Sequence, residues 1–100
     1  MEMHVDFTTE LQLEPITFCK YQLKVVNKHI LLSFPQLLDL RKRVNELSHH
    51  HSLEEIIDSD NFVLVFVADR QHLIYLDIPL LISLKGQMDA LFYSFNPVLI

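Results

Sequence analysis

The sequence contains the same pattern twice, and this repetition constrains the fold more than any other feature. Residues 21–47 and 64–91 both carry an alternating apolar run, a short polar turn, a second apolar run, a proline and a helical apolar stripe. The matched positions are His29 with His72, Ser33 with Asp77, Pro35 with Pro79, Leu37 with Leu81, Leu40 with Leu84, Val44 with Met88 and Leu47 with Leu91. One extra residue near the second turn shifts the register between the copies. We therefore interpret each copy as two strands and a helix.

The first unit, residues 17–48, begins with a half-buried strand over 17–26. Apolar and polar side chains alternate there, as they do in a strand that has one buried face. The predicted core face carries Cys19, Tyr21, Leu23 and Val25, and the outer face carries Lys20, Gln22 and Lys24. Asn27 and Lys28 form the predicted hairpin turn, because asparagine tolerates positive φ, and the returning strand is expected over residues 29–32.

A helix start follows each hairpin. Ser33 is a capping residue, and Gln36 lies three positions later, as a capping box requires. Asp77 occupies the corresponding position in the second unit. Pro35 and Pro79 both fall in the first turn, where a missing N–H is tolerated. Each unit is therefore expected to end in an amphipathic helix.

The second unit, residues 61–93, begins with a strand that is apolar on both faces. Phe62, Leu64, Phe66 and Ala68 share one face, and Val63, Val65 and Val67 share the other. Such a strand should be covered on both sides. Gly86 lies inside the following helix at a cost of about 1 kcal/mol relative to alanine. Either a close helix contact or a tolerated defect can account for it.

The two units predict one domain of the α+β class. We expect a two-layer sandwich in which the hairpins join into a four-stranded, mainly antiparallel sheet with both helices on one face. Residues 1–16 form either an added edge strand or an arm. Residues 49–60 are a polar linker with a short helical turn capped by Ser52 and Glu55. Residues 94–100 are an apolar tail.

The repeat also assigns the faces of the sheet, and this assignment predicts an interface. Matching 21–25 with 64–68 puts Leu64, Phe66 and Ala68 in the core and the valines outside. The predicted outer apolar surface consists of Val63, Val65 and Val67, extended by Leu73 and Tyr75. A sheet face of this kind should not lie in water, so the terminal segments or a second copy of the protein cover it. We expect a homodimer, or a complex with another protein.

The composition of the chain limits the classes of partner that we expect. The chain has 13 acidic and 8 basic residues, a net charge of −5, which disfavours a nucleic-acid partner. The longest strong apolar run, 62–68, is too short for a membrane span, and the first residues lack the pattern of a signal peptide. Cys19 is the only cysteine, so the chain can form no internal disulfide. We expect a cytoplasmic protein with no membrane partner.

Few residues of the chain suggest a metal-binding or catalytic role. His49, His50 and His51 are the metal-ligand candidates, but adjacent side chains diverge on a regular backbone, so we favour a polar linker and assign no metal. The single glycine excludes glycine-rich phosphate loops and nucleophile elbows. We therefore expect no catalytic residue, no cofactor and no enzyme activity. The alternative is a regulator that binds a metal at the histidines or a small ligand in a cleft between the two helices.

The pattern of the chain also resembles a known kind of protein. The stretches YQLKVVNKHILLSFPQLLDLRKRVNEL and FVLVFVADRQHLIYLDIPLLISLKGQMDALF resemble small bacterial proteins that consist of a domain of unknown function. The similarity runs from Phe18 to Phe92 and lies in structural patterns. It implies the arrangement of two hairpins and two helices, and it implies no activity.

Overall fold

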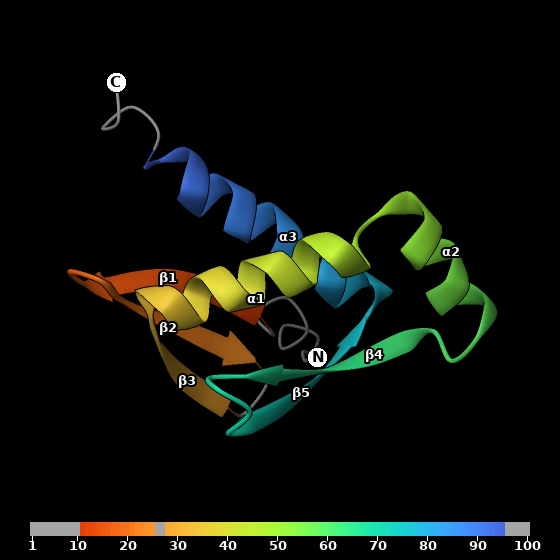
Figure 1. Cartoon of the computed structure of the whole chain (residues 1–100), viewed down its shortest axis with the longest axis horizontal. Coiled ribbons are helices and arrows are strands. Elements are labelled where there is room, and N and C mark those ends of the chain that lie inside the picture. Colours follow the sequence, from red (N-terminus) through yellow and green to blue (C-terminus); the bar gives the residue numbers. More distant parts are fainter. Residues whose placement is uncertain (1–10, 26–27, 96–100) are drawn as a thin grey trace, which may run out of the picture.

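Two antiparallel sheets and three helices are formed by residues 11–25 and 28–95, the part of the chain that this computed structural model describes (Figure 1). The first sheet has the order β1-β2-β3, and the second pairs β4 with β5. The elements are β1 (Leu11–Thr17), β2 (Lys20–Val25), β3 (Lys28–Ser33), α1 (Phe34–Leu47), α2 (His50–Asp58), β4 (Phe62–Val67), β5 (His72–Asp77) and α3 (Ile78–Tyr93). The α+β class is confirmed, and the order strand, strand, helix occurs in β2-β3-α1 and again in β4-β5-α3.

The two hairpins do not join into the four-stranded sheet that we expected. β1 pairs with the free side of β2, so the first hairpin becomes a three-stranded sheet, while β4 and β5 form a sheet of their own. Where β3 and β5 approach, the Lys28 Nζ donates a hydrogen bond to the Leu73 carbonyl over 3.2 Å. The two sheets are therefore linked there by a side chain.

The N-terminal segment supplies an edge strand, as one of our two alternatives proposed. Leu11–Thr17 is β1, and residues 1–10 lie outside the described part of the chain. The strand expected over 17–26 is shorter than predicted because the chain turns between β1 and β2. Cys19 lies in this turn with a φ of 59° and is exposed. The prediction that Cys19 faces the core is therefore wrong.

Both predicted helix starts are confirmed. The Ser33 Oγ accepts a hydrogen bond from the Gln36 N–H over 3.3 Å, and the Gln36 Oε1 accepts one from the Ser33 N–H over 3.0 Å. The Asp77 Oδ1 accepts a hydrogen bond from the Leu80 N–H over 2.9 Å. The predicted stripes are buried at Leu37, Leu40, Val44 and Leu47 on α1 and at Leu81, Leu84 and Met88 on α3. Leu91, the last position of the second predicted stripe, is only half-buried.

The segment between the units is more regular than predicted. Residues 50–58 form α2, and His49 is its N-cap, without a side-chain capping bond. Ser52 therefore lies inside the helix, and the capping box that we expected from Ser52 and Glu55 is wrong. The helix packs one buried side chain, Ile56, into the core.

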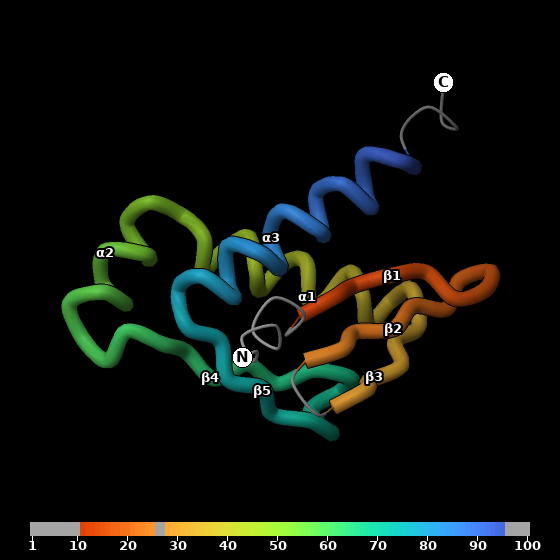
Figure 2. The backbone as a smooth tube through the Cα atoms, turned by 180° about the vertical axis from the view of Figure 1, so that it is seen from behind, coloured from red at the N-terminus to blue at the C-terminus, as the bar shows by residue number. Residues whose placement is uncertain are grey.

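The core lies between the sheets and the two long helices. α1 contacts β2, β3 and β4, while α3 contacts β1 and β5, so each helix spans both sheets. Figure 2 shows α3 running beside β1. There the Gln87 Oε1 accepts a hydrogen bond from the Leu13 N–H over 2.8 Å, and the Gln87 Nε2 donates one to the Leu11 carbonyl over 3.0 Å. One amide side chain thus occupies the outer edge of β1, which otherwise has no strand partner in the described sheet.

Replacing Gly86 by alanine is expected to stabilise the protein by about 0.5–1 kcal/mol, because alanine restricts the unfolded chain and favours the helix. A Cβ at Gly86 would meet no atom of the described residues within 4 Å, so the explanation by a close contact with another helix is wrong. The shift in the urea midpoint at unchanged slope measures the effect. A loss of stability would mean that another surface packs against this position.

Candidate functional site

The valines of β4 face the interior. Val65 and Val67 are 2% and 3% exposed, whereas their neighbours Leu64 and Phe66 are 52% and 54% exposed. Val63 is half-buried and packs against the core. The prediction that these three valines form the outer face of the sheet is therefore wrong, and so is the placement of Leu64 and Phe66 in the core.

The reason lies in the length of the second turn. Leu23 pairs with Ile30 in the first hairpin, and Val65 pairs with Ile74 in the second, so Val65 occupies the place of Leu23. Two residues separate β2 from β3, but four residues, 68–71, separate β4 from β5. Our comparison allowed for one extra residue. An error of a single position moves every side chain of a strand to the other face.

The same register separates the two histidines that the repeat had paired. His72 pairs with Val67, as Lys28 pairs with Val25, so His72 corresponds to Lys28. His29 is exposed on β3, and His72 is half-buried at the start of β5. The paired-histidine correspondence is therefore wrong.

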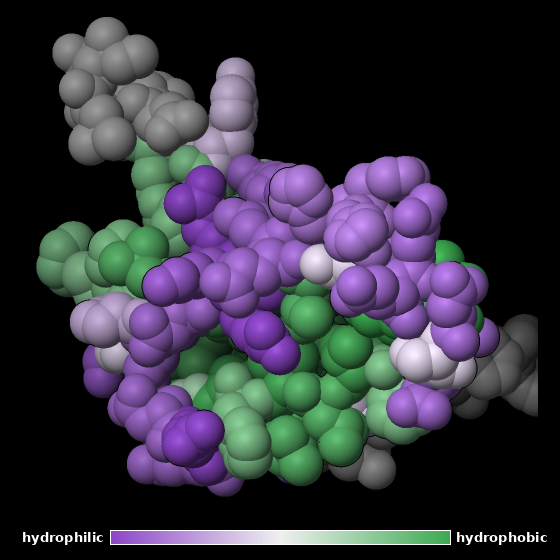
Figure 3. All heavy atoms as spheres, turned by 45° about the vertical axis from the view of Figure 1, so that its right-hand side comes forward, coloured by the Kyte–Doolittle hydropathy of each residue, from purple (hydrophilic) through white to green (hydrophobic). Residues whose placement is uncertain are grey.

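The corrected register creates an apolar surface on the second hairpin, which we call the β4–β5 outer face. Leu64 lies directly opposite Tyr75, and Phe66 lies directly opposite Leu73. All four side chains are more than two-fifths exposed. Leu73 and Tyr75 belong to the interface that we predicted from the sequence, and Leu64 and Phe66 complete their face. Figure 3 shows apolar side chains gathered at the level of β4 and β5, below the polar side chains of the helices.

Aromatic contacts order this face. The rings of Phe62 and Tyr75 lie 4.8 Å apart, and the Arg70 guanidinium lies 5.3 Å from the centre of the Phe66 ring. The surface is thus an apolar patch with a cation at its turn. Contiguous apolar surfaces of this kind on small proteins mark interaction sites.

The histidine triplet is the start of α2, and its side chains point into solvent. The His50 Nε2 lies 3.3 Å from a Glu54 oxygen, and the His51 Nε2 lies 3.8 Å from a Glu55 oxygen. Each contact is an exposed pair four residues apart on one helix. Over residues 11–25 and 28–95, no group of three or more potential ligand side chains is placed to hold a metal ion.

A groove opens at the other end of the molecule, between the β1–β2 turn and the last turns of α3. Its volume is about 760 Å³. The walls include Phe18 and Cys19 from the turn, Phe34 and Arg41 from α1, and Phe92 and Phe95 from the end of α3. Sequence reasoning missed it because its walls come from segments far apart in the chain.

Aromatic rings form the floor of this groove. The Tyr21 ring lies 6.3 Å from the Phe34 ring, which in turn lies 6.4 Å from Phe92, and Phe92 lies 5.2 Å from Phe95. Burial raises the pKa of the Tyr21 phenol above its ordinary value, and the electrostatic interaction with Cys19 raises it further. Tyr21 is therefore neutral near pH 7 and contributes apolar surface.

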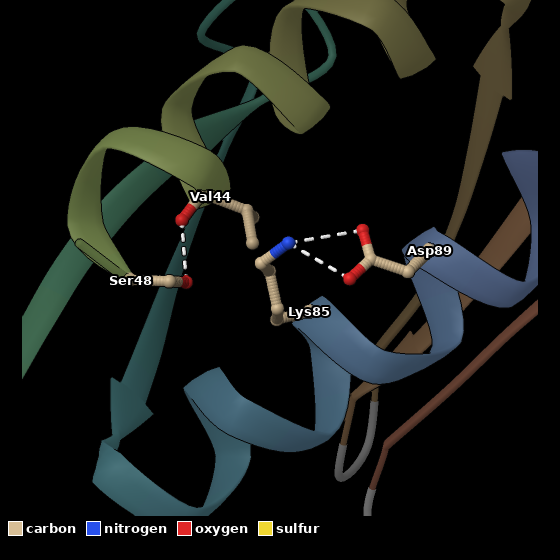
Figure 4. Close-up of polar contacts among 4 residues, drawn as sticks. All are labelled: Val44, Ser48, Lys85 and Asp89. Carbon is tan, nitrogen blue, oxygen red and sulfur yellow. Dashed lines mark hydrogen bonds and ion pairs between the residues drawn. The ribbon is translucent and has the colours of Figure 1, made fainter. Parts of the chain in front are cut away.

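Two charged side chains line the groove, Arg41 and Asp89. Asp89 forms an ion pair with Lys85, and the closest oxygen lies 2.8 Å from the Lys85 Nζ (Figure 4). The same view shows the end of α1 next to this pair, where the Ser48 Oγ donates a 2.6 Å hydrogen bond to the Val44 carbonyl. The carboxylate of Asp89 thus already has a cationic partner.

Comparison with known proteins adds no family to this description: no family model matches the chain, and no curated protein and no solved structure gives a significant match. The resemblance to small bacterial proteins therefore rests on the sequence pattern alone. Within the described ranges, no helix is both long and apolar enough to cross a bilayer.

Proposed function

We propose that this protein is a non-catalytic protein–protein interaction module that forms a homodimer through the β4–β5 outer face. The observation that supports this most is the group of four large apolar side chains, Leu64, Phe66, Leu73 and Tyr75, exposed on one face of a two-stranded sheet.

A second copy of the chain is the partner that this surface suits best. In a two-fold dimer the same patch meets itself, which requires a surface without uncompensated charge at its centre. The four side chains of the face are uncharged, and Arg70 lies at the turn. Half of the chain is apolar, which is a high share for so small a domain and fits a buried interface.

The remaining sequence expectations belong to the same proposal. We infer that the two strand–strand–helix units arose by internal duplication, supported by their matching registers. We also infer a cytoplasmic, single-domain protein that uses no cofactor and binds neither nucleic acid nor membrane. The net charge of −5 supports the exclusion of nucleic acid.

Light scattering coupled to size-exclusion chromatography tests the dimer. Across a dilution series the wild-type protein is expected at twice the chain mass of 11.8 kDa. Leu64→Asp is expected at the mass of one chain with an unchanged circular dichroism spectrum, because the charge must be desolvated at the interface. Leu64 is 52% exposed, so the aspartate is expected to leave the folding of the subunit intact.

Ile57→Asp is the matched control, since Ile57 is 53% exposed on α2 and lies outside the β4–β5 outer face. It is expected to keep the dimer. A wild-type protein that is monomeric at every concentration, or a Leu64→Asp variant that still dimerises, would contradict the proposal.

A further inference from the structure

We propose that the groove between the β1–β2 turn and α3 binds a small amphipathic carboxylate, with its carboxylate on Arg41 and its apolar body on the aromatic floor. None of the four side chains of the β4–β5 outer face lines the groove, so this inference is independent of the oligomeric state.

The dimensions and lining of the groove fit a small organic molecule. Small-molecule sites measure roughly 300–1,000 Å³ and combine apolar walls with few polar groups. This groove measures about 760 Å³, and Tyr21, Phe34, Phe92 and Phe95 supply its apolar surface. An alkyl chain or a ring packed there would remove these side chains from water.

Arg41 supplies the recognition of the anion. Its guanidinium carbon lies 4.4 Å from the centre of the Phe92 ring, so the ring covers one face of the group. Its Nε is buried and has no hydrogen-bond partner within residues 11–25 and 28–95. A guanidinium binds a carboxylate with two parallel hydrogen bonds, which fix both the position and the orientation of the anion.

The charge balance of the groove favours an anion. The carboxylate of Asp89, the other charged side chain in the lining, is paired with Lys85. Arg41 takes part in none of the ion pairs formed among residues 11–25 and 28–95. Among the described residues, Arg41 is thus the charged lining side chain without an ion-pair partner, and a cation beside an apolar floor complements a monoanion with an apolar body.

Isothermal titration calorimetry at neutral pH with decanoate and with decan-1-ol tests this inference. The two probes share an alkyl chain and differ in the charged head. Decanoate is expected to bind with one molecule per chain. Decan-1-ol is expected to bind more weakly, with a dissociation constant at least about tenfold higher. Arg41→Met is expected to weaken decanoate about tenfold and to leave decan-1-ol unchanged. Arg43→Met, which removes an exposed cation paired with Glu46, is the matched control and is expected to have no effect.

Cys19 reports where the ligand sits, because it lines the groove, is exposed and is the only cysteine of the chain. Decanoate is expected to slow the alkylation of Cys19 by N-ethylmaleimide several-fold in the wild type, and this protection is expected to be lost in Arg41→Met. If Arg41→Met does not fold, Arg41→Lys keeps a charge without the planar fork and is expected to weaken decanoate while Cys19 stays alkylatable. The inference is overturned if decanoate shows no saturable binding at millimolar concentration, or if it binds no better than decan-1-ol.

Discussion

Val65→Asp is expected to unfold the protein, with a loss of about 4 kcal/mol or more in the free energy of unfolding. Val65 is 2% exposed and pairs with Ile74, which is also 2% exposed. A carboxylate at this position would be buried with no cation beside it, and uncompensated burial of a charge is among the most destabilising single changes. Urea unfolding followed by circular dichroism measures the loss.

Leu64→Asp is the control for this variant, because the two residues are adjacent on β4 and lie on opposite faces. Its subunit is expected to keep its stability within about 0.5 kcal/mol when both variants are compared as monomers at low concentration. The opposite outcome, a folded Val65→Asp and an unfolded Leu64→Asp, would restore the face assignment that the sequence repeat predicted.

Leu84→Ala is expected to cost about 2–5 kcal/mol, because it leaves a cavity where the surrounding structure relaxes only in part. Leu84 is 0% exposed in the middle of α3, the helix that contacts both sheets. Ile82→Ala lies on the same helix, where Ile82 is 53% exposed, and is expected to change the stability by no more than about 0.5 kcal/mol. The difference in urea midpoints between these two variants is the measurement.

Equal losses in Leu84→Ala and Ile82→Ala would contradict the assignment of the α3 stripe. They would mean that α3 is buried on both of these sides, which the described contacts of the helix do not show. A loss confined to Leu84→Ala, together with an unchanged slope in urea, would confirm that the core lies between α3 and the sheets.

Local signals were readable from the sequence. The capping box of Ser33 and Gln36 and the cap at Asp77 depend on residues three positions apart. The helical stripes depend on spacing within one helix, and the α3 stripe containing Leu84 was predicted correctly at its buried positions. Such features need no knowledge of the rest of the fold, which is why they survive comparison with the structure.

The faces of β4 were not readable in the same way. Both faces of this strand are apolar, so periodicity cannot say which is buried. Only the length of the turn decides which face is buried. Ala68, Asp69 and Arg70 all have positive φ, but none of them is a glycine, so the sequence carries no clear signal for this turn. The repeat had to be aligned across this turn, and one misjudged residue reversed the prediction.

The groove could not be predicted from the sequence, for a different reason. Its walls combine the turn at Cys19, the α1 residue Arg41 and the end of α3. No spacing along the chain brings these segments together, since their proximity is a product of packing. Arg41 lies over the Phe92 ring, which gives it a different environment from Arg43, whose guanidinium pairs with Glu46.

The hydrogen bonds from the Gln87 side chain to β1 can form only late in the synthesis of the chain. β1 precedes α3 in the chain, and the side chain that occupies its outer edge leaves the ribosome more than seventy residues later. Until α3 has been made, a nascent first sheet would present the backbone N–H of Leu13 and the carbonyl of Leu11 to any neighbouring strand. Unpaired strand edges on incomplete chains are prone to intermolecular pairing. The last helix therefore also protects the beginning of the described fold, and chains interrupted before Gln87 would expose an adhesive edge.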